Sequence, residues 1–331
     1  MPLAAVAQSL DRVRSPALKL VLSRSAWLRR IVQSRAFRIE FLAATSLTVA
    51  LAVTLSAPSL LFMWAPLVLG VPHLVADVRY LVLAPYSAIP QRACDLLVVA
   101  MLAATLWWVS PVVGLAAVVV TLVLSPWRQA TPRNVGIRIG LLAVVGLACA
   151  VAWRDPIPTS YVLLHAHNVV AVLLFSLVFG PGRARWMVPL IVAIIVAAVA
   201  GGLIDPWLHR VSLDNLAGYV LPTHALETWA PITCARIAVL FIFLQSVHYT
   251  IWLRLLPEQA RPRNAMRSFG ASLRALQQDF GRLLVGAFAL LGCGLLLWGW
   301  HDVFAARQGY LRLANFHAYL ELAFLARWLT T

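Results

Sequence analysis

The stretch that decides the fold class is LLFMWAPLVLGVPHLVADVRYLVLA, residues 60–84. About 20 apolar residues in a helix span the ~30 Å hydrocarbon core of a bilayer, so this stretch is long enough to cross it. Of the 331 residues, 62% are apolar and 12% are charged, whereas soluble proteins are about half apolar and a quarter charged. This composition excludes a soluble enzyme, a disordered chain and a nucleic-acid-binding domain, and it indicates a polytopic membrane protein.

Further apolar stretches of similar length run through the chain. Ten spans are predicted, at 37–57, 60–84, 94–109, 111–126, 137–153, 160–179, 186–204, 231–253, 283–300 and 311–328. Prolines fall between or just beyond these stretches, where helices break. The sequence therefore predicts an all-α transmembrane bundle of about ten spans (eight to ten), in which the short pair 94–109 and 111–126 could be re-entrant.

The arginines are distributed unevenly between the two sides of this bundle. With the N-terminus inside, the inside connections carry Arg92, Arg128, Arg133, Arg183, Arg185, Arg254, Arg261, Arg263, Arg267 and Arg274. The outside connections carry Arg154, Arg210 and Arg307 with the acids Asp155, Asp205, Asp214, Glu227 and Asp302. The positive-inside rule then places both termini in the cytoplasm of a bacterium, with the chain in the inner membrane. The net charge of +15 is assigned to these connections and to anionic lipid, not to nucleic acid.

Outside the spans, two segments have their own character. Residues 1–36 are basic and amphipathic, and they predict an uncleaved cytoplasmic helix lying on the membrane. Residues 37–331 form one transmembrane domain, whose long connection 205–230 is predicted to be an outer loop or lid. His224 and Glu227 lie three residues apart in this connection and could cover a site from above. The four cysteines form no C-x-x-C motif and are predicted to be small buried hydrophobes: Cys94, Cys149, Cys234 and Cys293.

Ionisable side chains inside spans are the candidates for function, because burying them in a membrane is costly. Five histidines lie within the predicted spans: His73, His165, His167, His248 and His317. Two of them have a carboxylate four residues later, Asp77 after His73 and Glu321 after His317, and this spacing puts both side chains on one helix face. Neutral imidazole with carboxylate suits non-haem iron or zinc, and the carboxylate could be a ligand or could orient the imidazole. The structural alternative is a His–Asp hydrogen bond between packed helices.

The spacing of the remaining histidines limits which of them share a site. His165 and His167 point about 200° apart on a helix, so only one of them can face a given metal ion. Asn168 shares the face of His165. His248 lies about 9 Å to the cytoplasmic side of its span centre and His165 about 7 Å to the outer side of its own, so one site holds both only if helices tilt. Otherwise His248, with Tyr249 beside it, belongs to an inner polar network with Arg79.

Residues 70–77 read Gly-Val-Pro-His-Leu-Val-Ala-Asp, which resembles the Gly-x-Pro-His-Gly-x-x-Asp signature of the Brp/Blh family. These bacterial and archaeal membrane proteins cleave β-carotene to retinal and bind non-haem iron through histidines. Gly70, Pro72, His73 and Asp77 match, whereas Leu74 stands in place of the family's glycine. A later family helix carries two histidines four residues apart, where this chain has His248 followed by Trp252. The resemblance implies a multispanning all-helical fold and O₂-dependent oxidation of a carotenoid-like substrate.

Taken together, these observations predict a membrane-bound iron oxygenase that acts on a hydrophobic, carotenoid- or lipid-like small molecule. The predicted ligands are His73, His317 and one of His165 and His167, with Asp77 and Glu321 as ligands or orienting groups and His248 as a further candidate. Fe²⁺ is the expected metal, because thiolates are lacking, and zinc is the alternative. Two other functions remain open: a haem b electron carrier with paired axial histidines, and a proton-coupled transporter.

The arginine distribution makes a topological prediction. A reporter enzyme that is active only outside the cytoplasm is expected to give no signal when it is fused after Thr331, since that end is predicted to be cytoplasmic. The same reporter inserted after Asp155 should be active. A strong signal from the C-terminal fusion would overturn the predicted orientation.

Overall fold

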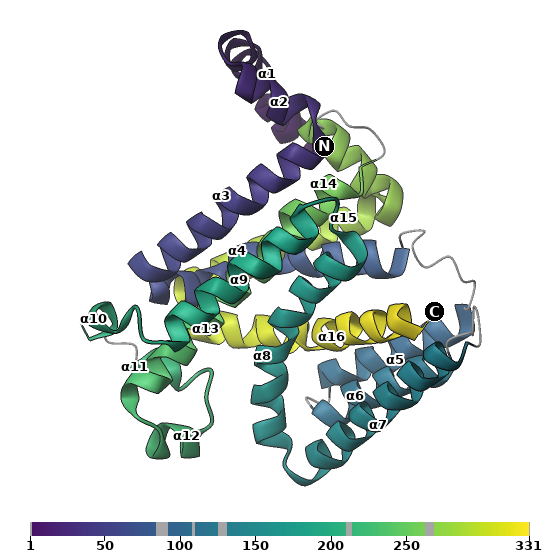
Figure 1. The fold of residues 1–331 in the computed structure, drawn as a ribbon. Coiled ribbons are helices and arrows are strands. Elements are labelled where there is room, and N and C mark those ends of the chain that lie inside the picture. Colours follow the sequence, from purple (N-terminus) through teal and green to yellow (C-terminus); the bar gives the residue numbers. More distant parts are fainter. Residues whose placement is uncertain are drawn as a thin grey trace.

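The computed structural model of the protein describes residues 2–83, 92–107, 110–124, 131–209, 214–261 and 268–330. Every regular element within these ranges is a helix (Figure 1). Six helical stretches are long and apolar enough to cross a membrane: Arg35–Ser56, Pro58–Leu83, Pro132–Arg154, Pro156–Phe179, Pro231–Gln259 and Phe269–His301. Two shorter apolar helices are Pro111–Leu124 and Ala184–Ala200. The protein is therefore an all-helical bundle with the composition of a membrane protein.

The long helices, in chain order, are α3 (Arg35–Ser56), α4 (Pro58–Asp77), α5 (Arg92–Trp107), α6 (Pro111–Leu124), α7 (Pro132–Arg154), α8 (Pro156–Leu174), α9 (Ala184–Ala200), α13 (Pro231–Thr250), α15 (Phe269–His301) and α16 (Val303–Thr330). Three of them continue as π-helical segments, η1 (Val78–Leu83), η2 (Phe175–Phe179) and η3 (Ile251–Leu255), and α14 (Leu256–Gln259) follows η3. Where the structure describes them, the ten predicted spans lie on these long helices and their π-helical continuations, except for Ala57, which lies between α3 and α4, and 201–204, which form turns. The number that crosses the bilayer and the side of the termini stay predictions.

Prolines mark where the helices start. Pro58, Pro111, Pro132, Pro156 and Pro231 are each the first residue of a helix. The first amides of a helix have no intrahelical partner, so the missing N–H of proline is harmless there, and its fixed φ suits the helix. The prolines that separate apolar stretches in the sequence therefore begin the next helix and do not only end the previous one.

The helix α16 runs through the middle of the bundle (Figure 1) and contacts α4, α5, α6, α7, α8 and α15. The helices α7 and α15 lie at the periphery, where only 11% of their most apolar windows is buried. Leu283 and Trp300 on α15 are 86% and 85% exposed. Apolar side chains exposed to this extent along whole helices are suited to lipid and not to water.

The N-terminal segment forms α1 (Pro2–Arg24) and α2 (Ala26–Gln33). The Asp11 carboxylate accepts hydrogen bonds from the backbone amides of Phe269 and Gly270, 2.8 and 2.9 Å long, at the start of α15. Such a cap satisfies amides that the helix itself leaves unpaired. α15 bends at Gly281, whose φ of 80° favours glycine, so its first turns can follow α1 while the rest joins the bundle. The predicted single interfacial helix is thus two helices, of which α1 is attached to α15.

A buried ion cluster closes the predicted cytoplasmic end of the bundle. Glu258 accepts from Arg38 at 2.7 Å and from Arg261 at 2.7 Å, and Arg38 also donates to the backbone oxygen of Val32 at 2.6 Å. The three contacts join α2, α3 and α14. Because both charges of the Arg38–Glu258 pair are buried, removing one partner alone would leave the other uncompensated, which typically costs about 3–5 kcal/mol.

The connection 205–230 contains three short helices, α10 (Asp205–Leu208), α11 (Asp214–Ala217) and α12 (Thr223–Thr228), while 210–213 lies outside the described residues. Its apolar side chains pack on α4 and α13 through a cluster that includes Leu208, Val220, Phe62 and Phe241. In Figure 1 both marked chain ends lie away from this group of short helices. The described parts of the connection therefore cover the predicted outer ends of α4 and α13.

Two groups of predictions from the sequence need adjustment. Cys234 is buried and Cys149 is partly buried, but Cys293 is exposed on α15, because this helix presents its apolar side chains outward. The side chain of Cys94 is not described. Four arginines that contribute to the topology argument lie outside the described residues: Arg128, Arg210, Arg263 and Arg267.

One ion pair fixes the 205–230 connection to α13. Arg236 donates to both carboxylate oxygens of Asp205, and Gly202, with φ of 87°, makes room for the pair. This hydrogen bonding holds the pKa of Asp205 below its usual value. A lowered carboxylate pKa stabilises the folded state above about pH 4, and the contribution is lost as the pH falls through the lowered pKa.

Asp205→Asn is therefore expected to lower the midpoint of thermal unfolding at pH 7 by a few degrees, and the difference from the unmodified protein should shrink at pH 3. Asp155→Asn, which removes an exposed carboxylate at the same end, serves as the matched control and should change little. Equal midpoints for the Asp205 variant and the unmodified protein at pH 7 would contradict this role.

Candidate metal centre

Four helices bring four histidines together in the interior of the bundle. They are His73 on α4, His167 on α8, His248 on α13 and His317 on α16, and none is more than 8% exposed. The ring centroid of His73 lies 4.6 Å from that of His248 and 4.9 Å from that of His317. The ring centroid of His167 lies 5.0 Å from that of His248 and 5.3 Å from that of His317. These side chains come from positions up to 244 residues apart, so only the tertiary fold unites them.

The depth of His248 along its helix differs from the depth predicted from the sequence, which assumed straight spans. The helical stretch that carries it runs from Pro231 to Gln259, six residues beyond the predicted end at 253, so its midpoint is residue 245 and His248 lies only about 4.5 Å past it. The stretch Pro156–Phe179 likewise has His167 at its middle. Both imidazoles are therefore at the same depth as His73 and His317.

Three of these histidines and the carboxylate of Glu321 can reach one ion. A nitrogen each of His73, His248 and His317 and a carboxylate oxygen of Glu321 all lie within 4.8 Å of one another. The Nε2 atoms of His73 and His248 are 2.9 Å apart, and Nε2 of His248 is 3.3 Å from Oε1 of Glu321. Two ligand atoms at right angles around an ion, each about 2.1 Å from it, are about 3 Å apart. The spacing therefore matches neighbouring ligands of one metal ion.

The Nδ1 atoms of two imidazoles each lie near an oxygen atom of their own helix. Nδ1 of His73 lies 3.4 Å from Oδ1 of Asp77, and Nδ1 of His317 donates to the backbone oxygen of Ala314. An imidazole whose Nδ1 carries the proton keeps a lone pair on Nε2, the arrangement found in metal-ligating histidines held by a carboxylate or carbonyl. The position four residues after His73 therefore suits Asp77 to orienting the ring.

The two carboxylates of the site are buried, and imidazole nitrogens lie beside them, 3.4 Å from Asp77 and 3.3 Å from Glu321. Asp77 and Glu321 are both 0% exposed, and none of their four oxygens has a hydrogen-bond partner among the described residues. An isolated carboxylate in an apolar interior is too costly to stay ionised. A divalent cation between the imidazoles would balance two carboxylates and leave the site neutral, which fits the donor set.

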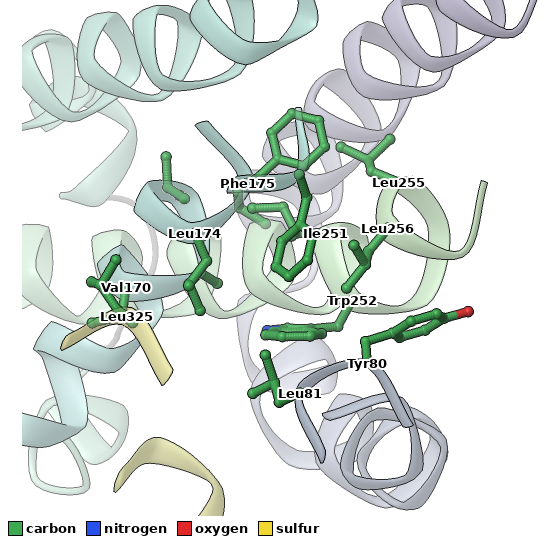
Figure 2. Packing of buried hydrophobic residues seen from close by; sticks show 14 of the residues in the cluster. Tyr80, Leu81, Val170, Leu174, Phe175, Ile251, Trp252, Leu255, Leu256 and Leu325 are labelled. Atoms are coloured by element: carbon green, nitrogen blue, oxygen red, sulfur yellow. The ribbon is translucent and has the colours of Figure 1, made fainter. Parts of the chain in front are cut away.

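The helices that carry three of the histidines change to π-helix just beyond the site. η1 begins directly after Asp77, η3 begins three residues after His248, and η2 follows α8, which carries His167. Figure 2 shows Leu81 of η1, Phe175 of η2 and Trp252 of η3 in one apolar cluster. π-turns are rare and are frequent at functional sites. Their common packing forms an apolar floor under the candidate site.

A cavity of about 410 Å³ lies on the other side of the imidazoles. Its lining includes all four histidines but neither Asp77 nor Glu321. The rings therefore separate the cavity from the carboxylates. A small molecule in the cavity would lie beside the imidazoles that would hold the ion.

The structure separates the other predicted site residues. His165 turns away and its Nε2 lies 2.9 Å from the backbone oxygen of Val220, so His167 is the histidine of this helix that reaches the cluster. Arg79 forms an ion pair of 2.6 Å with Asp279 and not a network with His248. The predictions for His165 and Arg79 therefore need correction.

The remaining candidates lie at different distances from the cluster. Tyr249 stands beside it, with its ring centroid 5.3 Å from that of His73. Asn168 is buried, lines the cavity and donates to the backbone oxygen of Leu164 at 3.4 Å. His224 and Glu227 are exposed on α12 and do not line the cavity.

Two neighbours of the site were not predicted to belong to it from the sequence. Tyr310 is buried against α4 at Gly70, where an added Cβ would overlap its ring, and it lines the cavity beside His73. Trp252 is 0% exposed and its ring lies 6.1 Å from that of His73. The glycine in Gly-x-Pro-His was a signal for close approach at Gly70, but only the fold shows which ring approaches.

Comparison with known proteins found no matching family model, no matching curated protein and no matching solved structure. The resemblance to the Brp/Blh signature therefore covers residues 70–77 and stays a hypothesis. The chemistry of the centre rests on its side chains.

The geometry predicts which histidine substitutions impair metal binding. His73→Ala should weaken binding of Co²⁺, a spectroscopic probe for the divalent ion, by more than about 100-fold, because loss of an orienting group alone costs 10–100-fold. His165→Ala removes an imidazole from the same bundle without touching the cluster, and it should bind Co²⁺ normally. Titration of detergent-purified protein by visible absorption measures both, and equal affinities would contradict the assignment.

Proposed function

We propose that the protein is a membrane-bound non-haem iron oxygenase that acts on a hydrophobic, carotenoid- or lipid-like small molecule. The observation that carries this proposal is the set of His73, His248, His317 and Glu321, whose ligand atoms lie within 4.8 Å of one another, at the base of a cavity of about 410 Å³. Three imidazoles and one carboxylate bind iron or zinc, and sites with open positions serve catalysis in both cases. Iron is proposed because the set is close to the imidazole–carboxylate chemistry of non-haem oxygenases.

The geometry argues against the haem alternative. The axial nitrogens of a bis-histidine haem lie on opposite sides of the iron, about 4 Å apart, with the porphyrin plane between them. The Nε2 atoms of His73 and His248 are only 2.9 Å apart, and a third imidazole and a carboxylate converge on the same point. No described contact singles out a proton-coupled transporter.

The proposed reaction class has three supports. The donor set suits Fe²⁺, the cavity is large enough for a small-molecule ligand, and residues 70–77 resemble the Brp/Blh signature. Bound iron would supply the one-electron chemistry that lets O₂ react with an organic molecule. The apolar bundle gives a membrane-dissolved substrate access without passage through water.

The roles of the protein's own side chains follow from their positions. His73, His248, His317 and Glu321 hold the ion. Asp77 orients His73 through Nδ1, and the backbone oxygen of Ala314 does the same for His317. The apolar floor that contains Trp252 keeps water from the carboxylate side.

The Glu321→Gln variant tests whether Glu321 is a metal ligand or only a structural residue. The amide keeps the shape of the side chain but removes the charge that offsets a divalent cation, so the variant is expected to fold and to lose most of its metal. Metal content by elemental analysis and the unfolding midpoint should be measured on the same preparation. Unchanged metal content would remove Glu321 from the site.

Activity is tested with Fe²⁺-loaded protein in neutral detergent, supplied with β-carotene or oleate as probes. O₂ consumption is expected with one of them and should be lost in His73→Ala but not in His165→Ala. A haem absorption band in the purified protein, or metal-loaded protein that consumes no O₂ with either probe, would count against the proposal.

A further inference from the structure

The cavity above the imidazoles is polar and positively charged at one end. Its exposed lining residues are Ser160, Gln308 and Arg312, and they mark the side on which it opens, whereas its four histidines are buried or nearly so. Ser160 is in the first turns of α8 and Gln308 in the first turns of α16, so the opening lies toward the predicted outer end of the bundle. The cavity thus leads from a polar mouth to the candidate metal centre.

Arg312 is the cation at this mouth. It forms no ion pair and no hydrogen bond with the described residues, and the cavity lining contains neither Asp nor Glu. It lies on α16, about 13.5 Å along the helix from its start at Val303. Because Arg312 is exposed at the mouth and no acid lies beside it in the cavity lining, its guanidinium can receive an anionic group that enters the cavity.

A second cavity provides the contrast. It has about 530 Å³, lies between α4, η3 and α15, and is lined almost entirely by apolar side chains. Its one lining cation, Arg79, is neutralised by Asp279 at 2.6 Å. A third cavity, of about 410 Å³, also has a lining cation without an ion pair among the described residues, Arg254, but it contains none of the four histidines. The cavity at the histidines differs because it joins such a cation to the candidate metal centre.

From this we infer that the cavity binds a single-chain amphiphile with an oxyanion head group, a carboxylate or a phosphate. Arg312 binds the head group through its planar, fork-like set of donors, beside the amide of Gln308 and the hydroxyl of Tyr161. The apolar chain lies along Leu163, Leu164 and Leu311.

The dimensions fit this ligand and give it a direction. A volume of about 410 Å³ is in the range of small-molecule pockets, which suits one chain. Arg312 precedes His317 by five residues on α16, about 7.5 Å along the axis. A head group at Arg312 therefore places carbon atoms near the head group beside the imidazoles. The inference rests on the proposed function only in naming this amphiphile as the substrate, because binding itself does not need the metal.

Binding is tested on purified full-length protein in a neutral maltoside detergent, with tritiated palmitate as the probe. Unlabelled palmitate, hexadecyl phosphate and hexadecanol compete in parallel, together with acetate and inorganic phosphate. Palmitate and hexadecyl phosphate should compete at least about tenfold better than hexadecanol, because a hydrogen bond to a charged group is worth more than one to a neutral group. Acetate and phosphate should not compete at the same concentrations. Hexadecanol competing as well as palmitate, or a free anion competing as well as either amphiphile, would overturn the inference.

Variants locate the binding. Arg312→Gln should weaken palmitate binding about tenfold or more and leave hexadecanol unaffected, and Ser160→Trp should block the mouth for both. Arg154→Gln removes an exposed arginine at the same end but outside the cavity, so it is the matched control and should bind normally. Palmitate binding that is unchanged in Arg312→Gln or in Ser160→Trp would place the ligand elsewhere and overturn the inference.

Metal analysis of the same preparations separates the two proposals. Protein that binds palmitate as described but takes up no iron when Fe²⁺ is added refutes the oxygenase and leaves the amphiphile site standing. Protein that holds iron but binds palmitate no better than hexadecanol refutes the amphiphile site alone.

Discussion

Glu321 and Asp77 carry carboxylates into the middle of an apolar bundle, where neither side chain is exposed. The protein offers their oxygens no hydrogen bond within the described residues. Charged groups in such a place need a partner of opposite charge or a proton. One nitrogen of each of three imidazoles lies within 4.8 Å of the others and of a Glu321 oxygen, and imidazole nitrogens cannot all donate to one another. A bound cation would satisfy the carboxylates and the nitrogen lone pairs together.

The surrounding architecture holds this arrangement from both sides. Below it, the π-helical segments pack Leu81, Phe175 and Trp252 into one apolar floor. Beside it, Gly70 lets the Tyr310 ring press against α4 one turn before His73. Packed interiors resist small displacements, so these contacts fix the positions of the ligand atoms more firmly than the flexible side chains could alone. Rigid support of this kind is what a metal site needs for defined geometry.

The sequence predicts part of this centre, and the missing part has identifiable causes. The i, i+4 pairs His73–Asp77 and His317–Glu321 follow from helical periodicity, which is local. The membership of His248 does not, because it depends on α13 continuing through η3 to Gln259, and a π-turn leaves no clear mark in the apolar pattern. Periodicity separates His165 from His167, but only the packing of α8 shows which of them faces inward. Arg312 was likewise invisible, because its cavity exists only between helices.

The central position of α16 is explained by what its polar side chains contact and not by the hydropathy of the helix. It is central in the bundle, yet it is not among the six stretches apolar enough to span a membrane by composition. Its polar side chains are directed to specific features: His317 and Glu321 to the candidate centre, and Arg312 to the cavity. Each of these groups is costly in lipid and acceptable where a ligand or counter-charge meets it. A metal ion that binds only the assembled bundle would therefore add its binding free energy to the docking of α16, and the site would stabilise the helix that completes it.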